Sequence, residues 1–350
     1  MIIENYLPPS LIWPCLRGKP APTKGWVVSE MKIVPLEFEK PLFELRKKLE
    51  DLTNQSGDHS VDLRAEIESM QQKIEETKTA IYRNLSAWQR VQIARHTARP
   101  YALDYVWHCF TDYVELAGDR CFGEDKSMPA GFATIDGHRC MVIGHQKGRN
   151  TKENLLRNFG CAHPEGYRKA LRLMKLAEKF QLPVIAMIDT PGAYPGVGAE
   201  ERHIAEAIAV NLREMMVLRT PIISVVIGEG GSGGALGIGV ADRVLMLENA
   251  YYSVISPEGC AAILWKHRSH AADAAEALKL TADDLLKYEL IDDVVPEPLG
   301  GAHQNHEATY ASFREKIVAN LASIKKVRTD RLLEDRYAKF RKFGVFDTTG

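Results

Sequence analysis

The sequence has almost no net charge, no closely spaced cysteine pair and no long apolar run. Its 45 basic and 46 acidic residues leave a formal charge of -1, so it lacks the positive field that general nucleic-acid binding relies on. The six cysteines form no C-x-x-C pair, which argues against a disulfide framework and a cysteine-based zinc site. The apolar runs at 183–188 and 221–227 are far shorter than the roughly 20 residues of a spanning helix. We expect a cytoplasmic chain with free thiols, no membrane segment and no bound metal.

The composition is that of a globular protein with a sizeable core. The chain has 350 residues, of which 45% are hydrophobic and 26% are charged. Residues 1–36 differ, because they carry six prolines and show no sustained periodicity. We predict that this stretch is a disordered extension, and Met31 offers a second possible start.

Two apolar stripes with helical spacing follow the extension. Leucines recur every three or four residues from Leu42 to Leu52, and a second stripe runs from Leu63 to Ile81. Charged residues separate the apolar positions in both segments. The pattern predicts an N-terminal helical hairpin over residues 37–90, with a coiled-coil-like seam between its helices.

The central part of the chain alternates strand-like runs with helical stretches. Asp136-Gly137 lies between two apolar runs, which is a strong signal for a β-hairpin. Strands are expected at 183–189 and 221–227, with a helix over 199–218 between them. This alternation predicts an α/β domain over residues 91–325, built on a largely parallel, buried sheet. Residues 326–350 are expected to form a C-terminal helical tail.

The sharpest local feature is the glycine-rich segment Gly228–Ala235, which holds five glycines in its first seven positions. So few Cβ atoms in one turn cost conformational entropy, and they allow a ligand to approach the backbone closely. The segment precedes a short helix of small residues, whose first N–H groups have no partner within the helix. Such groups stabilise a negatively charged oxygen, as in an oxyanion hole or a phosphate loop.

Other interpretations of this segment stay open at the level of the residues alone. Its glycines satisfy G-x-G-x-x-G with Glu248 20 residues further on, as in a dinucleotide fold, although the helix between is short. They also satisfy G-x-S-x-G, which would make Ser232 a hydrolase nucleophile served by a distant histidine such as His267 or His303. A third possibility is a glycine turn that only packs tightly.

A second corner, Asp189–Glu201, again follows a buried strand and precedes a helix. Its glycines and prolines fix an unusual loop at the same edge of the sheet. Two loops rich in accessible backbone at one sheet edge predict a single cleft.

Five segments of the chain carry a resemblance to a known family, and they are Ile143–Arg149, Pro164–Arg172, Ile188–Glu201, Gly228–Ala235 and Tyr252–Cys260. Together they resemble the carboxyltransferase alpha subunits of bacterial acetyl-coenzyme A carboxylase, and the resemblance runs from about Pro35 to near the C-terminus. It implies a crotonase-like (Clp protease/crotonase) α/β fold, a spiral of ββα units behind the helical hairpin. The first 30 residues depart from the family pattern, which favours Met31 as the functional start.

The resemblance also implies a reaction and its partners. The family moves a carboxyl group from carboxybiotin, held on a separate biotin carrier protein, to acetyl-coenzyme A, and this gives malonyl-coenzyme A in the first committed step of fatty acid synthesis. The implied partners are a beta subunit with a zinc ribbon, the carrier protein and biotin carboxylase, and the implied assembly is alpha2beta2. The cofactor is biotin, which this chain does not carry covalently.

The resemblance assigns roles to six residues. Gly233 and Gly234 are the expected oxyanion donors, Gly230 and Gly231 shape the turn, and the expected cleft wall is Gly192 and Ala193. Lys147 and Arg149 belong to a basic segment whose side chains are suited to coenzyme A phosphates. A solvated face or a subunit contact is the alternative role for this segment.

Three other functions remain as alternatives. A crotonase-like acyl-coenzyme A hydratase or isomerase would act without biotin, a serine hydrolase would depend on Ser232, and a non-catalytic scaffold would use its glycines only for packing. His145 could act as a base, although a satisfied core histidine is the expected role. Glu258 is expected to be no more than a carboxylate in the first turn of a helix.

Overall fold

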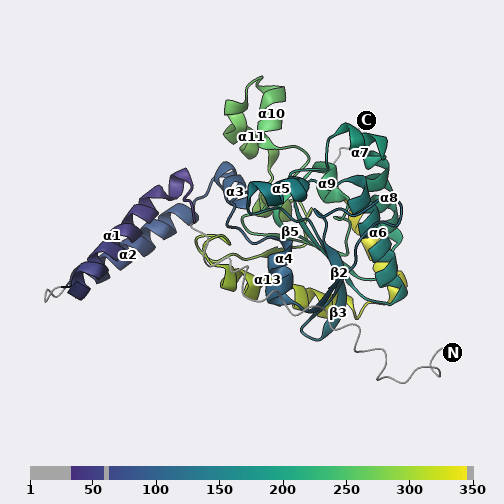
Figure 1. The fold of residues 1–350 in the computed structure, drawn as a ribbon, viewed down its shortest axis with the longest axis horizontal. Coiled ribbons are helices and arrows are strands. Elements are labelled where there is room, and N and C mark those ends of the chain that lie inside the picture. The colour runs from purple at the N-terminus through teal and green to yellow at the C-terminus, as the bar shows by residue number, and fades with distance from the viewer. Residues whose placement is uncertain (1–32, 59–62, 345–350) are drawn as a thin grey trace.

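The computed structural model describes residues 33–58 and 63–344 (Figure 1). Most of the predicted extension at 1–36, including Met31, lies outside the described residues, as does the end of the predicted tail from residue 345. Within the described part of the chain, no helix is long and apolar enough to cross a membrane.

The predicted helical hairpin is present as an arm that reaches away from the body (Figure 1). A short 3-10 turn, η2 (Glu37–Glu39), leads into α1 (Lys40–Asp58), which packs along α2 (Arg64–Tyr82). The arm has its own small core, in which Leu42 and Ile74 are buried. At its root, buried Glu39 binds the Tyr82 hydroxyl and lies 2.8 Å from Nε2 of His303. This polar contact joins the arm to the body.

The body is built on one mixed sheet of eight strands. The strands follow the order β1-β2-β3-β4-β5-β6-β8, and β7 pairs with the end of β5. The first three pair antiparallel, and the pairs from β3 onward are parallel. The bounds are β1 Thr111–Glu115, β2 Ala130–Ile135, β3 His138–Gly144, β4 Val184–Thr190, β5 Ile222–Gly231, β6 Arg243–Leu247, β7 Tyr251–Ser253 and β8 Asp293–Val295.

Helices cover both faces of this sheet. In Figure 1, α6 and α8 lie together on one side, and α4 and α13 lie together on the other. Every residue of β4 and β5 is buried, as expected for parallel strands covered on both faces. The helices of the body are α3 Ala87–Ala94, α4 Ala102–Cys109, α5 Thr151–Leu156, η3 Asn158–Gly160, α6 Pro164–Lys179, α7 Val197–Glu201, α8 Ile204–Val217, α9 Ser232–Leu236, α10 Pro257–Leu264, η4 Arg268–His270, α11 Ala271–Leu278, α12 Ala282–Lys287, α13 His306–Ile324 and α14 Thr329–Arg341.

The predicted hairpin turn at Asp136-Gly137 joins β2 to β3, and both turn residues have the positive φ that such turns require. The helix expected over 199–218 is instead two helices, because His203 adopts a left-handed conformation with φ 63° and ends α7. The strand expected to stop at 227 continues through the glycines to Gly231, since β7 pairs with them. A short strand, β8, also lies near the end of the α/β domain, where no strand was predicted.

The last helix, α14, is anchored by a buried arginine. Arg336 is 1% exposed, and its guanidinium makes two 2.8 Å hydrogen bonds to Asp242. It also donates to the backbone carbonyls of Met215, Leu218 and Thr220. Five hydrogen bonds from one side chain therefore fix α14 against the end of α8 and the loop before β6.

Replacing Arg336 should destabilise the body strongly. The Arg336→Met variant leaves the Asp242 carboxylate buried without its cation, a change that costs about 3–5 kcal/mol of unfolding free energy. Urea denaturation followed by circular dichroism measures the loss. The matched control is Arg331→Met on the same helix, whose exposed ion pairs should contribute less than about 1 kcal/mol. Equal stability of the two variants would contradict this account of α14.

Candidate active site at the glycine corners

The two glycine-rich corners meet at the carboxyl edge of the sheet. β4 and β5 are parallel neighbours, and Thr190 at the end of one pairs with Gly230 near the end of the other. A Cβ atom on Gly231 would lie 2.2 Å from the carbonyl oxygen of Pro191, and one on Gly234 would lie 2.5 Å from the amide nitrogen of Ala193. Backbone therefore packs directly on backbone, which only glycine allows at these two positions.

The helix α9 begins inside this contact. Ser232 holds a left-handed conformation with φ 49°, and it turns the chain from β5 into the helix. Gly233 and Gly234 follow in the first turn, where N–H groups have no acceptor within the helix. Gly233 is partly exposed, whereas Gly234 is buried against Gly192 and Ala193. The Tyr167 hydroxyl donates to the Gly234 carbonyl at 3.2 Å and holds the turn from the side of α6.

Beneath the corners lies a group of charged side chains. The Lys147 ammonium is 2.6 Å from Oδ1 of Asp189 and 2.7 Å from Oε1 of Glu229. Asp189 is the second-last residue of β4 and Glu229 lies among the glycines of β5, so Lys147 bridges the two strands. The same Asp189 oxygen accepts the Glu229 backbone N–H at 2.9 Å, and a Cβ on Gly228 would lie 2.5 Å from it.

The group continues through Arg95. Its Nε donates to Oε2 of Glu229 at 2.7 Å, and its Nη1 donates to Glu258 at 2.5 Å. The Tyr251 hydroxyl donates to the same Glu229 oxygen at 2.7 Å. We call the side chains of Lys147, Asp189, Glu229, Arg95, Glu258 and Tyr251 the charge cluster. Glu258, expected to be only a first-turn carboxylate of α10, is thus an ion-pair partner of Arg95.

Burial and ion pairing act in opposite directions on this cluster. Burial would raise the pKa of Glu229, but the Lys147 and Arg95 cations outweigh it and hold that pKa at about 2. Burial would lower the pKa of Lys147, but Asp189 and Glu229 outweigh it and raise the pKa above its ordinary value. For Asp189 burial dominates and raises the pKa, because it shares its one ammonium with Glu229. Lys147 and Glu229 therefore stay charged at neutral pH.

Arg149, the second predicted phosphate contact, is also engaged within the protein. Its guanidinium donates to the carbonyls of Thr97 and Arg99 and pairs with the carboxylate of Asp104. It also lies 3.9 Å from the ring centre of Tyr101. These contacts fix the connection between α3 and α4, and a role in phosphate binding stays a prediction for both Arg149 and Lys147.

His145 lies at the end of β3 and is fully buried. Burial, with a smaller contribution from the nearby Lys147 ammonium, lowers its pKa to about 3. Among the described residues, neither ring nitrogen has a hydrogen-bond partner. His145 is therefore a buried, neutral ring, but it is not the satisfied core histidine that we expected.

The geometry does not support the hydrolase and dinucleotide interpretations of the first corner. The two histidines considered for Ser232 are engaged elsewhere, His303 with Glu39 and His267 with Ser269. The helix α9 has only five residues, and Glu248 accepts the backbone N–H of Glu297 from the neighbouring strand end. What the corners do offer is backbone N–H groups.

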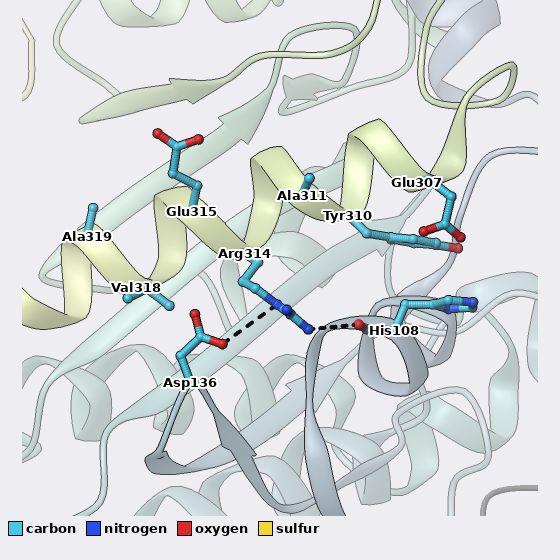
Figure 2. A pocket seen from close by; sticks show the side chains of 9 residues that line it. All are labelled: His108, Asp136, Glu307, Tyr310, Ala311, Arg314, Glu315, Val318 and Ala319. Carbon is cyan, nitrogen blue, oxygen red and sulfur yellow. Dashed lines mark hydrogen bonds and ion pairs between the residues drawn. The ribbon is translucent and has the colours of Figure 1, made fainter.

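Two further features lie away from the corners. Glu39, His96 and His303 come close enough to hold a metal ion, but both His96 nitrogens are engaged, Nδ1 by the Ala98 N–H at 3.1 Å and Nε2 by the Val34 carbonyl at 2.8 Å. A surface hollow along α13 contains none of the predicted site residues (Figure 2). The hollow is lined by His108, Asp136, Glu307, Tyr310, Ala311, Arg314, Glu315, Val318 and Ala319.

Solved structures with similar folds show which fold this chain has. A transcarboxylase 12S core with methylmalonyl-coenzyme A bound superposes with a TM-score of 0.54 at 19% identity, over 72% of this chain and 44% of that one. A Pseudomonas malonate decarboxylase hetero-tetramer in complex with coenzyme A gives 0.52 at 18% identity, over 63% and 91%. The likeness establishes the fold, which is the predicted crotonase-like fold of carboxyltransferases.

The sequence relatives narrow the class further. Residues 35–344 match the family described as acetyl co-enzyme A carboxylase carboxyltransferase-like. The acetyl-coenzyme A carboxylase carboxyl transferase subunit alpha of Geobacter metallireducens is 57% identical over 311 residues, which cover 89% of this chain and 98% of that protein. The corresponding protein of Photobacterium profundum is 55% identical over 312 residues. The chain belongs to the alpha-subunit family of acetyl-coenzyme A carboxylase carboxyltransferases, and is thus one subunit of an enzyme.

The sequence pattern indicated the glycine-rich corners as a candidate site, but it did not indicate most ion pairs of the charge cluster. Arg95, Asp189 and Glu229 did not stand out, because carboxylates and guanidinium groups are common and their partners lie far away in the sequence. Lys147 is 42 residues from Asp189 and 82 from Glu229. The available signal for this cluster was the presence of an acidic residue near the end of each of two buried strands, Asp189 in β4 and Glu229 in β5.

The buried state of His145 predicts its titration. In the unfolded chain the ring takes up a proton near its ordinary pKa of 6.5, whereas in the folded chain the pKa is about 3. Unfolding is therefore favoured as the pH falls below 6.5, by about 1.4 kcal/mol per pH unit from this group. We expect the His145 ring resonances to stay constant in NMR spectra from pH 8 to pH 5, assigned by comparison with His145→Gln. A titration midpoint near 6.5 would contradict the assignment.

Proposed function

We propose that this chain supplies one half of a site that transfers the carboxyl group of carboxybiotin to acetyl-coenzyme A, forming malonyl-coenzyme A. The observation that carries the proposal is the start of α9, where the backbone of Gly234 packs against Gly192 and Ala193. The N–H groups of Gly233 and Gly234 lie in the first turn of this helix and have no acceptor within it. Carboxybiotin supplies an activated carboxyl group when it is bound. This chain supplies the N–H groups that stabilise negative charge during the transfer.

The role of the glycines is to stabilise negative charge on oxygen. Removing the methyl proton of a thioester places charge on the thioester oxygen, and loss of a carboxyl group from a cyclic urea does the same on the urea oxygen. Fixed N–H donors aimed at such an oxygen are worth about 3–4 kcal/mol each in comparable sites. Gly233 and Gly234 are our candidates for these donors, with Gly230, Gly231, Gly192 and Ala193 shaping the cleft.

A second polypeptide is expected to complete the site. Several large apolar side chains are exposed on segments that follow the carboxyl ends of β3, β4, β5 and β7. Large apolar side chains left exposed on a folded protein are typical of an interaction surface when they form a patch. We propose that a beta subunit with a zinc ribbon covers them, in an alpha2beta2 assembly. The side chains are Leu155, Leu156, Phe159, Val197, Leu236, Val254, Ile263, Leu264 and Trp265.

The proposed donor of the carboxyl group is a biotin carrier protein, charged by a separate biotin carboxylase. The corners suit such a donor, because they present backbone rather than a side-chain nucleophile. A hydratase or isomerase acting on an acyl-coenzyme A would need a carboxylate placed over the substrate. Two carboxylates of the corner segments, Asp189 and Glu229, are instead held in the charge cluster.

The division of the site predicts that the isolated chain is inactive. Mixed with carboxybiotin and acetyl-coenzyme A, it should form no malonyl-coenzyme A above background, and addition of the beta subunit should restore transfer. Mass-spectrometric detection of malonyl-coenzyme A measures both arms. Robust transfer by the chain alone would disprove the divided site, and hydration of an enoyl-coenzyme A without biotin would favour the hydratase alternative.

The two glycines of α9 give a matched pair of variants. A Cβ on Gly233 has room, with its nearest neighbour Ile208 at 3.7 Å, whereas one on Gly234 would collide with Gly192 and Ala193. Gly234→Ala should therefore shift the donors and lower kcat of the assembled enzyme by roughly 100-fold, since displacements of about 1 Å have that effect. Gly233→Ala should retain activity within about tenfold.

Thermal unfolding and subunit assembly are measured on both variants, because a strained turn can imitate a catalytic defect. Ser232→Ala is included as a test of the hydrolase alternative and should keep most of the activity. An assembled Gly234→Ala enzyme with the parental kcat would show that the contact between the corners is not needed for transfer.

A further inference from the structure

Lys147 is placed to hold the two corners in register, although the basic segment to which it belongs is predicted to contact coenzyme A phosphates. Its ammonium makes an ion pair with the last acidic residue of β4 and another with the only acidic residue among the glycines of β5. The side chain is 12% exposed, and a Cβ on Gly160 would lie 2.8 Å from its Cγ, so η3 packs over it. Both ion pairs of the Lys147 ammonium are made with buried carboxylates of the protein.

The partners of Lys147 lie directly next to the site. Asp189 is three residues before Gly192, and Glu229 is four residues before Gly233. The Glu229 backbone N–H donates to the Asp189 carboxylate, so the two strand ends are joined once by this backbone-to-side-chain hydrogen bond and once through Lys147. Loss of the Lys147 ammonium would therefore be expected to shift the backbone of both corners, since its two partners are only three and four residues away from them.

The glycines cannot supply this connection themselves. They have no side chains to interlock, and the register between β4 and β5 shifts between Ile188 and Thr190, just where the corners begin. The parallel ladder therefore does not fix the corners alone. Buried ion pairs have strict geometric requirements, and they are sensitive to the loss of one partner.

We propose that Lys147 is a positioning residue, which sets the distance between the Gly192–Ala193 corner and the Gly233–Gly234 donors by bridging Asp189 and Glu229. This inference rests on the proposed carboxyltransferase function and adds to it a residue that acts through the backbone. It makes Lys147 important for kcat and unimportant for the binding of coenzyme A phosphates.

The test is the kinetics of Lys147→Met in the assembled enzyme. If the residue positions the donors, kcat should fall by about 100-fold, as for other small displacements of reacting groups. KM for acetyl-coenzyme A should change by less than about threefold, because substrate binding is not the function removed. The matched control is Lys316→Met, which removes an ion pair with Asp293 on β8, and it should leave both constants unchanged. An unchanged kcat with a large rise in KM would overturn the proposal in favour of phosphate binding.

A truncated substrate separates the two roles independently. The acetyl thioester of pantetheine carries none of the phosphates of coenzyme A. A positioning residue predicts the same ratio of parental to Lys147→Met turnover with this substrate as with acetyl-coenzyme A. A phosphate-binding residue predicts that the ratio collapses to about one, because the lost contact is absent in both enzymes.

A triple variant addresses the case in which Lys147→Met fails to fold because Asp189 loses its ammonium and Glu229 keeps only Arg95. The combination Lys147→Met, Asp189→Asn and Glu229→Gln removes the ammonium together with both of its carboxylate partners, while Arg95 stays paired with Glu258. Removal of all partners is tolerated better than removal of one. It should assemble and still show kcat lowered at least about tenfold. Parental kcat in this variant would overturn the proposal. Absence of carboxyl transfer by the parental complex would instead reject the proposed function, so the two failures are distinguishable.

Discussion

The ammonium of Lys147, shared between Asp189 and Glu229, is the interaction on which the arrangement of the corners depends. It ties the ends of two parallel strands together where the chain leaves the sheet and side chains become scarce. Arg95 extends the same cluster to Glu258, so it also links α3 and α10 to β5. A site made of backbone needs such support from neighbouring side chains, because its glycines have no side chains of their own that could form ion pairs or hydrogen bonds.

Several glycines of the first corner lie where a side chain would collide with the second corner. Gly228 lets Asp189 reach the backbone of β5, while Gly231 and Gly234 let one corner lie directly on the other. Gly233 is different, since the space beside it is open apart from Ile208. Close packing therefore requires glycine at positions 228, 231 and 234, whereas position 233 has room for a Cβ atom.

Local patterns predicted much of the fold. The Asp136-Gly137 turn, the buried apolar strands and the helical hairpin all follow from short-range periodicity and turn chemistry. The break at His203 and the strand β8 were not predicted, because the first depends on one residue's backbone conformation and the second on pairing with a strand far away in the sequence. The same limit applies to the site: its glycines are visible in the sequence, but the partners of Lys147 are brought together only by the folded sheet.

The most direct test of the account is a crystal structure of the assembled alpha and beta subunits with biotin bound. The account predicts that the urea oxygen of biotin lies about 3 Å from the amide nitrogens of Gly233 and Gly234, as oxyanion donors require. Lys147 should remain paired with Asp189 and Glu229 beneath them. Biotin bound away from both corners, or Lys147 turned outward onto a phosphate, would contradict it.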